Sequence, residues 1–166
     1  MTGWKLSIAL FASIAALLAI VPGCTIGLPF RGPGYDSSDG VTDPNADDQV
    51  LVALTYTVVN GNGEERSAFR RGISSVVDSL EEQPGLIGFS VRRELFGKQA
   101  WTMSVWTDED SLDAFVDSSA HREAMSSGGR ALEMVRSLRL EVPRAEIPLS
   151  WKRVEELFDA QVEASY

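Results

Sequence analysis

The sequence of 166 residues contains few of the residue types on which several classes of site depend. One cysteine cannot form an internal disulfide, and one histidine cannot supply a two- or three-histidine metal centre. Lys and Arg number 15 against 24 Asp and Glu, for a net charge of −9, and the basic residues form no cluster. Because phosphate backbones are bound by concentrated positive charge, these numbers argue against a nucleic-acid-binding protein. We expect neither a metal nor a cofactor.

Hydrophobic residues make up 44% of the chain, which is too high a share for a wholly disordered protein. At roughly 100 to 200 residues per domain, the length leaves room for one folded domain. The hydrophobic residues are unevenly spread, and their distribution divides the chain into three segments: residues 1–23, 24–48 and 49–166.

The longest apolar run lies in the first segment. Residues 6–21 (LSIALFASIAALLAIV) carry no charge and follow Lys5, which is the layout of a secretory signal. The run leads to Gly23 and Cys24, which resemble the lipobox of bacterial lipoproteins, where a cysteine is lipidated and becomes the mature N-terminus. We therefore predict a signal peptide over residues 1–23, a lipid anchor on Cys24, and an extracytoplasmic location at the cell membrane or outer membrane. An uncleaved membrane helix and secretion after ordinary cleavage are the alternatives.

The second segment has no apolar periodicity. Residues 25–48 contain four Gly, three Pro and five Asp against one Arg. Such a composition buries too little apolar surface to offset the conformational entropy lost on ordering. The sequence predicts a flexible acidic tether over residues 24–48 that begins at the lipidated cysteine.

The third segment alternates strand and helix patterns. β-Branched or alternating apolar residues predict strands, and apolar residues spaced by three and four predict amphipathic helices. Strands are expected at 49–59, 86–95, 100–106 and 138–142, and helices at 64–82, from about 108 to 116, at 119–125 and at 150–160.

This order is the βαββαβ arrangement of the ferredoxin-like α+β folds, followed by a C-terminal helix. It predicts an antiparallel sheet with helices on one face. Strand 86–95 offers Phe89 and Val91, and strand 100–106 offers Trp101 and Met103, so both faces of the sheet need cover. We predict a homodimer that closes sheet on sheet.

Three stretches of the third segment resemble the antibiotic biosynthesis monooxygenase family of dimeric α+β barrels. They are residues 83–89 (QPGLIGF), which enter a strand, Val105 and Trp106 at the end of the next strand, and residues 119–122 (SAHR) at a helix start. The resemblance covers about residues 49–142. It implies a cofactor-independent monooxygenase that acts on a small aromatic or quinol-type molecule, and it assigns Trp106 and His121 as the catalytic residues.

The reaction implied by this resemblance needs a base, an aromatic pocket and a donor for the developing oxyanion. His121 is the side chain whose ordinary pKa suits a base near neutrality. Trp106, with Tyr56 and Trp101, would form the wall of the pocket, and Arg92 or Ser104 would face the oxyanion.

Two alternatives stay open. The haem-degrading branch of the family carries an asparagine on its first strand and a second histidine, but residues 49–59 contain no asparagine and Met125 stands at the second position. That branch is therefore disfavoured, and Met125 is retained as a substrate-binding candidate. The other alternative is a non-catalytic module that keeps the same barrel and binds a small aromatic or lipophilic molecule or another partner.

Overall fold

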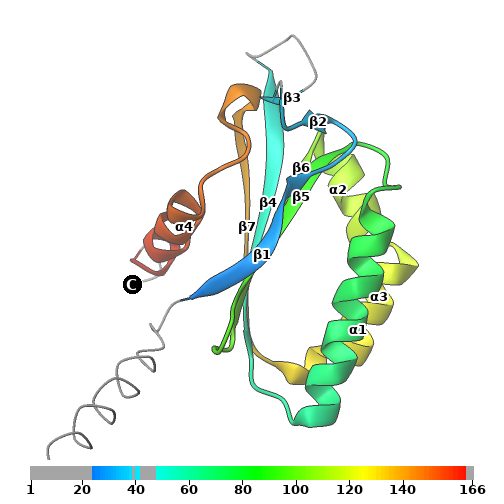
Figure 1. Ribbon diagram of the computed structural model, residues 1–166. Coiled ribbons are helices and arrows are strands. Elements are labelled where there is room, and N and C mark those ends of the chain that lie inside the picture. Colours follow the sequence, from blue (N-terminus) through cyan, green and yellow to red (C-terminus); the bar gives the residue numbers. More distant parts are fainter. Residues whose placement is uncertain (1–23, 39, 42–47, 164–166) are drawn as a thin grey trace, which may run out of the picture.

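The computed structural model describes residues 24–38, 40–41 and 48–163, so the predicted signal peptide lies outside the described residues. Five strands form one antiparallel sheet in the order β1-β5-β6-β4-β7, and a small β2-β3 hairpin stands beside it (Figure 1). The strands are β1 Thr25–Arg31, β2 Tyr35–Asp36, β3 Gly40–Val41, β4 Gln49–Val59, β5 Leu86–Glu94, β6 Gln99–Trp106 and β7 Leu132–Pro143. The α-helices are α1 Gly63–Leu80, α2 Glu109–Val116, α3 Ser119–Gly128 and α4 Trp151–Glu163. The predicted ferredoxin-like α+β fold is confirmed.

The first three helices cover one face of the sheet. The start of α1 is fixed by a capping box, in which the Asn62 side chain accepts the backbone N–H of Glu65 and the Glu65 carboxylate accepts the backbone N–H of Asn62. Asp108 caps α2 and Ser118 caps α3, each by accepting one backbone N–H of the first turn with its side chain. The core on this side contains six buried residues: Leu80, Leu86, Phe89, Trp106, Leu112 and Phe115.

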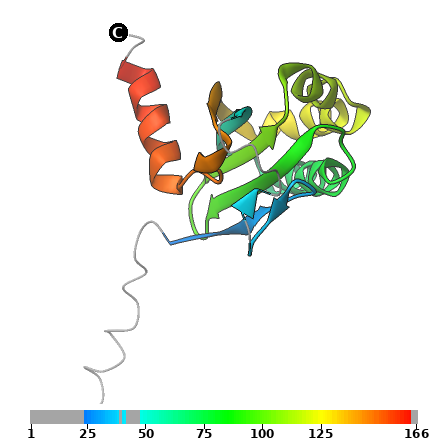
Figure 2. The same ribbon diagram turned by 90° about the horizontal axis from the view of Figure 1, so that it is seen from above.

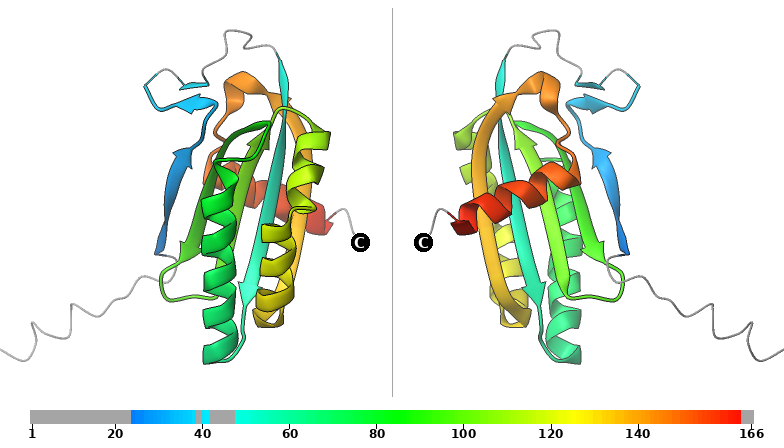
Figure 3. Two further views of the ribbon diagram at one scale, coloured as in Figure 1. Left: turned by 90° about the vertical axis from the view of Figure 1, so that its right-hand side faces the viewer. Right: turned by 90° about the vertical axis from the view of Figure 1, so that its left-hand side faces the viewer.

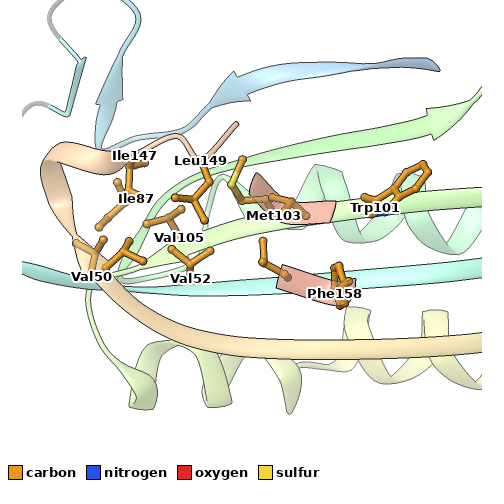
Figure 4. Close-up of a cluster of buried hydrophobic side chains, with 12 residues drawn as sticks. Val50, Val52, Ile87, Trp101, Met103, Val105, Ile147, Leu149 and Phe158 are labelled. Atoms are coloured by element: carbon orange, nitrogen blue, oxygen red, sulfur yellow. The ribbon is translucent and has the colours of Figure 1, made fainter. Parts of the chain in front are cut away.

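The opposite face of the sheet is covered by α4, which runs across the strands (Figures 2 and 3). Alternation along the strands supplies the apolar surface, because Val50, Val52 and Leu54 of β4 point to this side. Figure 4 shows how Phe158 of α4 lies over β4 and β6. The core here contains twelve buried residues: Val50, Val52, Leu54, Ile87, Trp101, Met103, Val105, Val142, Ile147, Leu149, Val154 and Phe158.

The position of α4 differs from the expected arrangement of helices on one face. The sequence predicted that an apolar sheet face would be left open and that a second copy would close it. The face is apolar as expected, but the chain covers it with its own last helix. A second copy therefore cannot pack on this face in the predicted way while α4 stays in place.

The flexible tether predicted for residues 24–48 is wrong in its first half. β1 pairs antiparallel with β5, from Thr25 opposite Glu94 to Arg31 opposite Phe89, and extends the sheet by one strand. Gly88 makes this possible, because a Cβ at that position would lie 2.6 Å from the Phe30 ring. Pairing with an exposed sheet edge stabilises a segment whose composition alone predicts no structure. Residues 39 and 42–47 of the predicted tether lie outside the described residues.

The strand predicted at 138–142 is also longer than expected. β7 begins at Leu132 and pairs with the whole length of β4, from Val59 opposite Leu132 to Gln49 opposite Pro143. Arg136 interrupts the apolar alternation in its first half, and for that reason the sequence pattern indicated only the second half of the strand.

Truncation of a buried α4 side chain should show how much of the stability comes from this helix. Phe158 is 3% exposed, so Phe158→Ala leaves a cavity against the sheet, and we expect the free energy of unfolding to fall by about 3 to 5 kcal/mol. Denaturant unfolding measures this value. Val162→Ala, on the same helix at 40% exposure, is the control and should change it by less than about 0.5 kcal/mol. Equal effects of the two substitutions would show that α4 does not pack as described.

Candidate functional site

Three rings lie in a row on the α1–α3 side of the sheet. Trp106 ends β6 and is fully buried, and its ring stacks on Phe115 of α2 with centroids 5.2 Å apart. Phe115 in turn contacts His121 of α3 at 5.3 Å. Phe115, which the sequence indicated only as a core residue, therefore lies between the two predicted catalytic residues.

The backbone around His121 fixes both the position and the tautomer of its ring. Its backbone N–H donates to the Ser118 hydroxyl, which places the residue in the first turn of α3. Its Nδ1 lies 3.0 Å from the Val116 carbonyl oxygen. A carbonyl only accepts, so Nδ1 carries the hydrogen in this bond and the neutral ring has its lone pair on Nε2. The arrangement suits a partly buried general base.

Ser104 lies on the same side of the sheet as Trp106. Its hydroxyl oxygen accepts the indole N–H of Trp106 at 2.9 Å, which satisfies a polar group inside the core. Accepting this bond leaves the hydroxyl hydrogen of Ser104 for another acceptor. The predicted oxyanion donor therefore supports the indole directly.

The other predicted site residues lie on the opposite face, beneath α4. The Arg92 guanidinium stands over the Trp101 ring, with its carbon 4.8 Å from the ring centroid, and over the Trp151 ring of α4 at 5.6 Å. It also forms an ion pair with Glu155 of α4 at 2.5 Å. Arg92 and Trp101 thus hold α4 against β5 and β6.

A second arginine repeats this arrangement one helical turn further along α4. Arg136 of β7 lies over the Tyr56 ring at 5.8 Å and over the Phe158 ring at 5.2 Å, and it donates to the Phe158 carbonyl oxygen. The Tyr56 ring also contacts Trp101 at 5.5 Å. We call the set Tyr56, Arg92, Trp101, Arg136, Trp151, Glu155 and Phe158 the α4 clamp. Sequence reasoning missed Arg136, because its strand was predicted to begin two residues later.

The sheet therefore divides the predicted site into two parts. Trp106, Ser104 and His121 share the α1–α3 side, whereas Tyr56, Arg92 and Trp101 belong to the α4 clamp. Met125 is 48% exposed on α3, and no contact places it with either group among the described residues. The predicted aromatic wall of Trp106, Tyr56 and Trp101 is wrong as a single wall, because strand alternation puts Tyr56 and Trp101 opposite Trp106.

An open surface depression of 760 Å³ lies at the other end of the molecule from the β5–β6 turn. It is lined by the turn that follows α1, by Pro33 and Gly34, and by Thr107 and Arg144. None of the predicted catalytic or substrate-binding residues lines it. Within the described residues no group of three or more His, Cys, Asp or Glu is placed to hold a metal ion.

Comparison with known proteins identifies the part of the chain that carries the three rings. The family model described as antibiotic biosynthesis monooxygenase matches residues 49–127. These residues form an antibiotic biosynthesis monooxygenase (ABM) domain. The match begins with β4 and ends within α3, so Trp106, Phe115 and His121 lie inside the ABM domain. Arg136 and α4 lie outside the matched residues.

Solved structures resemble the chain over the same core. PA3566 from Pseudomonas aeruginosa is 11% identical with a TM-score of 0.51, and the alignment covers 58% of this chain and 96% of that protein. SO0527 from Shewanella oneidensis is 10% identical with a TM-score of 0.50, covering 57% of this chain and 91% of that protein. At these identities the likeness shows the fold alone. The comparison with curated proteins gave no match.

Tyr56 of the α4 clamp should make the free energy of unfolding depend on pH. Burial raises the pKa of the Tyr56 phenol, and the Glu94 carboxylate raises it further, while Arg136 opposes them. The folded protein therefore holds this proton more tightly than the unfolded chain. The stability that the protonated phenol contributes is present at pH values below the ordinary tyrosine pKa of 10.0. It is lost as the pH rises above that value. We expect the free energy of unfolding to fall more steeply above pH 10 in the wild type than in Tyr56→Phe.

Denaturant unfolding at a series of alkaline pH values measures this difference. Tyr35→Phe is the control, because it removes another phenol and leaves Tyr56 in place. If the wild type and Tyr56→Phe lose stability in parallel above pH 10, the titration of Tyr56 is not coupled to folding.

Proposed function

We propose that the ABM domain is a cofactor-independent monooxygenase that acts on a small aromatic or quinol-type molecule, with His121 as its base. The observation that carries this proposal is the hydrogen bond from His121 Nδ1 to the Val116 carbonyl. It leaves the Nε2 lone pair of the neutral ring free to take a proton from a phenol. The match of residues 49–127 to the antibiotic biosynthesis monooxygenase family supports oxygen chemistry for the domain.

The proposed reaction begins with proton transfer from the substrate to His121 Nε2. The resulting electron-rich anion reacts with O₂. With an anthrone-type substrate, the ring methylene group becomes a carbonyl that holds one oxygen atom of O₂, and the second oxygen atom leaves as water. Oxidation of the methylene group to a carbonyl releases four electrons, the number that O₂ takes up, so the reaction needs no separate reductant.

The geometry gives the aromatic residues separate roles in this proposal. Phe115 contacts the His121 ring directly and would contact a substrate bound there. Trp106 has no exposed surface and lies behind Phe115, where it acts as a positioning residue for the Phe115 ring. Ser104 fixes the indole and keeps its hydroxyl hydrogen, so it stays a candidate donor to the oxyanion.

A second candidate function is a binding or interaction module with no catalysis. One observation favours it: Tyr56, Arg92 and Trp101, which were expected to line the pocket, are engaged with α4. A domain of this fold whose aromatic side chains are engaged within the chain would bind partners through its surface. The homodimer predicted from the sequence stays a prediction, and its interface would have to avoid the face that α4 covers.

Oxygen consumption separates the two candidates. The wild-type protein should consume O₂ with hydroquinones or anthrones, and His121→Ala should lower the rate by about 10² to 10⁴-fold, because the base is removed. An oxygen electrode measures the rate. Arg122→Ala is the matched control, since this neighbouring residue on α3 is exposed and should leave the rate unchanged.

Two results would count against the oxygenase. An unchanged rate in His121→Ala would remove this residue from the mechanism. Binding of the same compounds by the wild type, without any oxygen uptake, would favour the non-catalytic module.

We also propose that the protein is extracytoplasmic and anchored in a membrane through a lipid on Cys24. The apolar run that leads to Gly23 and Cys24 supports this proposal, together with the exposure of the Cys24 side chain. Among the described residues, none of the helices has the length and apolar character needed to cross a bilayer.

Detergent-phase partitioning tests the anchor. The wild-type chain should enter the detergent phase, and Cys24→Ser should move to the aqueous phase because the lipid can no longer be attached. Thr25→Ser, one residue further on, is the control and should partition as the wild type does. Retention of Cys24→Ser in the detergent phase would favour an uncleaved membrane helix.

A further inference from the structure

Four exposed apolar side chains lie at one end of the sheet. Ile26 and Leu28 of β1 are 41% and 39% exposed, and Leu95 and Phe96 in the turn between β5 and β6 are 38% and 73% exposed. Figure 1 shows the start of β1 beside this turn, at the same end of the molecule. We call these four residues the edge patch. Large apolar side chains that cluster at a surface usually mark a contact with a protein or a membrane.

The edge patch is joined directly to the proposed anchor point. The backbone N–H of Leu95 donates to the Cys24 carbonyl oxygen at 2.9 Å, and Thr25 pairs with Glu94. Residues in such a pair have Cα atoms roughly 5 Å apart. The apolar run of residues 6–21 ends just before Cys24, so a lipid or helix attached there enters the bilayer beside the patch. Cys24, the first of the described residues, thus adjoins the patch directly.

The charges around the edge patch also suit a bilayer with anionic lipids. Lys98 donates to the side-chain oxygen of Asn60, and Arg93 donates to the backbone carbonyl of Glu94. Both acceptors are neutral, so neither of these bonds pairs a positive charge with a carboxylate. The Glu94 carboxylate accepts the backbone N–H groups of Lys98 and Gln99 and so faces into its own turn. Residues 93–98 thus carry two positive charges and one negative charge, in a chain of net charge −9.

We propose that the edge patch rests in the interfacial region of the lipid bilayer and holds the domain in a fixed orientation against the membrane. The inference rests on the proposed anchoring at Cys24 and adds a second contact to it. Phe96 and the three aliphatic side chains enter the boundary between headgroups and acyl chains, and Lys98 and Arg93 reach anionic headgroups. The β5–β6 turn and the start of β1 then face the membrane, and the sheet end that carries the surface depression faces away from it.

Photocrosslinking in the anchored full-length chain tests this orientation. The chain is reconstituted in vesicles of phosphatidylethanolamine and phosphatidylglycerol, with benzoylphenylalanine in place of one residue at a time. Phe96→benzoylphenylalanine should form lipid adducts on illumination. Ile26 and Val162 are a matched pair, because their exposures are 41% and 40% and Val162 lies on α4. Benzoylphenylalanine at Ile26 should give several-fold more lipid adduct than at Val162.

A charge substitution provides a second measurement. Phe96→Glu places a carboxylate where the proposal needs an apolar ring, and the 73% exposure of Phe96 means that folding does not depend on it. In a chain with benzoylphenylalanine at Ile26, this substitution should lower the lipid adduct several-fold while detergent-phase partitioning stays unchanged.

Three outcomes would overturn the proposal. Equal lipid adducts at Ile26 and Val162 would mean that the domain has no fixed orientation. Adducts from Phe96 to a second copy of the chain would make the edge patch a protein interface. A chain found in the aqueous phase would overturn the anchoring itself, and partitioning of the same samples distinguishes that failure from an anchored chain that lacks lipid adducts at Phe96.

Discussion

The packing of α4 across the sheet is the interaction on which the rest of the structure depends. It supplies the second apolar layer that a four-helix, one-sheet domain needs, with Val154 and Phe158 buried against β4 and β6. Arg92 and Arg136 add directional contacts, since each guanidinium lies over one ring of the sheet and one ring of α4. With this layer in place, the chain itself buries an apolar core on each face of its sheet.

This closure decides which residues are available for chemistry. The aromatic side chains on the α4 side stabilise the fold, and the row of rings from Trp106 to His121 lies on the other side, within the ABM domain. Fold and candidate site therefore use different faces of the same strands. Strand alternation produces this division, because neighbouring residues of β6 such as Val105 and Trp106 belong to different cores.

The sequence predicts the strands and helices inside the ABM domain because the spacing of their apolar residues is regular. The β-branched run of β4 and the three-and-four spacing of α1 each indicate one structure, and His121 and Trp106 stand in recognisable stretches. β1 could not be predicted, because a seven-residue segment that contains Gly27 and Pro29 forms a strand here by pairing with the edge of β5. The position of α4 on the sheet could not be predicted either. An amphipathic pattern shows that one face of a helix is buried, but it does not show which surface that face packs against. The apolar residues of β5 and β6 indicated that both faces need cover, but the assignment of Tyr56 and Trp101 to the same wall as Trp106 did not take strand alternation into account.

The order of the elements along the chain has a consequence for synthesis. α4 follows every strand of the sheet, so the apolar surface of β4 and β6 has no cover until residues 151–163 have emerged from the ribosome. A nascent chain that has already formed its hairpin and its first three helices still exposes Val52, Met103 and Val105 to other chains. The fold is thus completed only after the last helix has been synthesised. Premature termination before α4 would yield an aggregation-prone fragment that still contains all residues of the ABM domain.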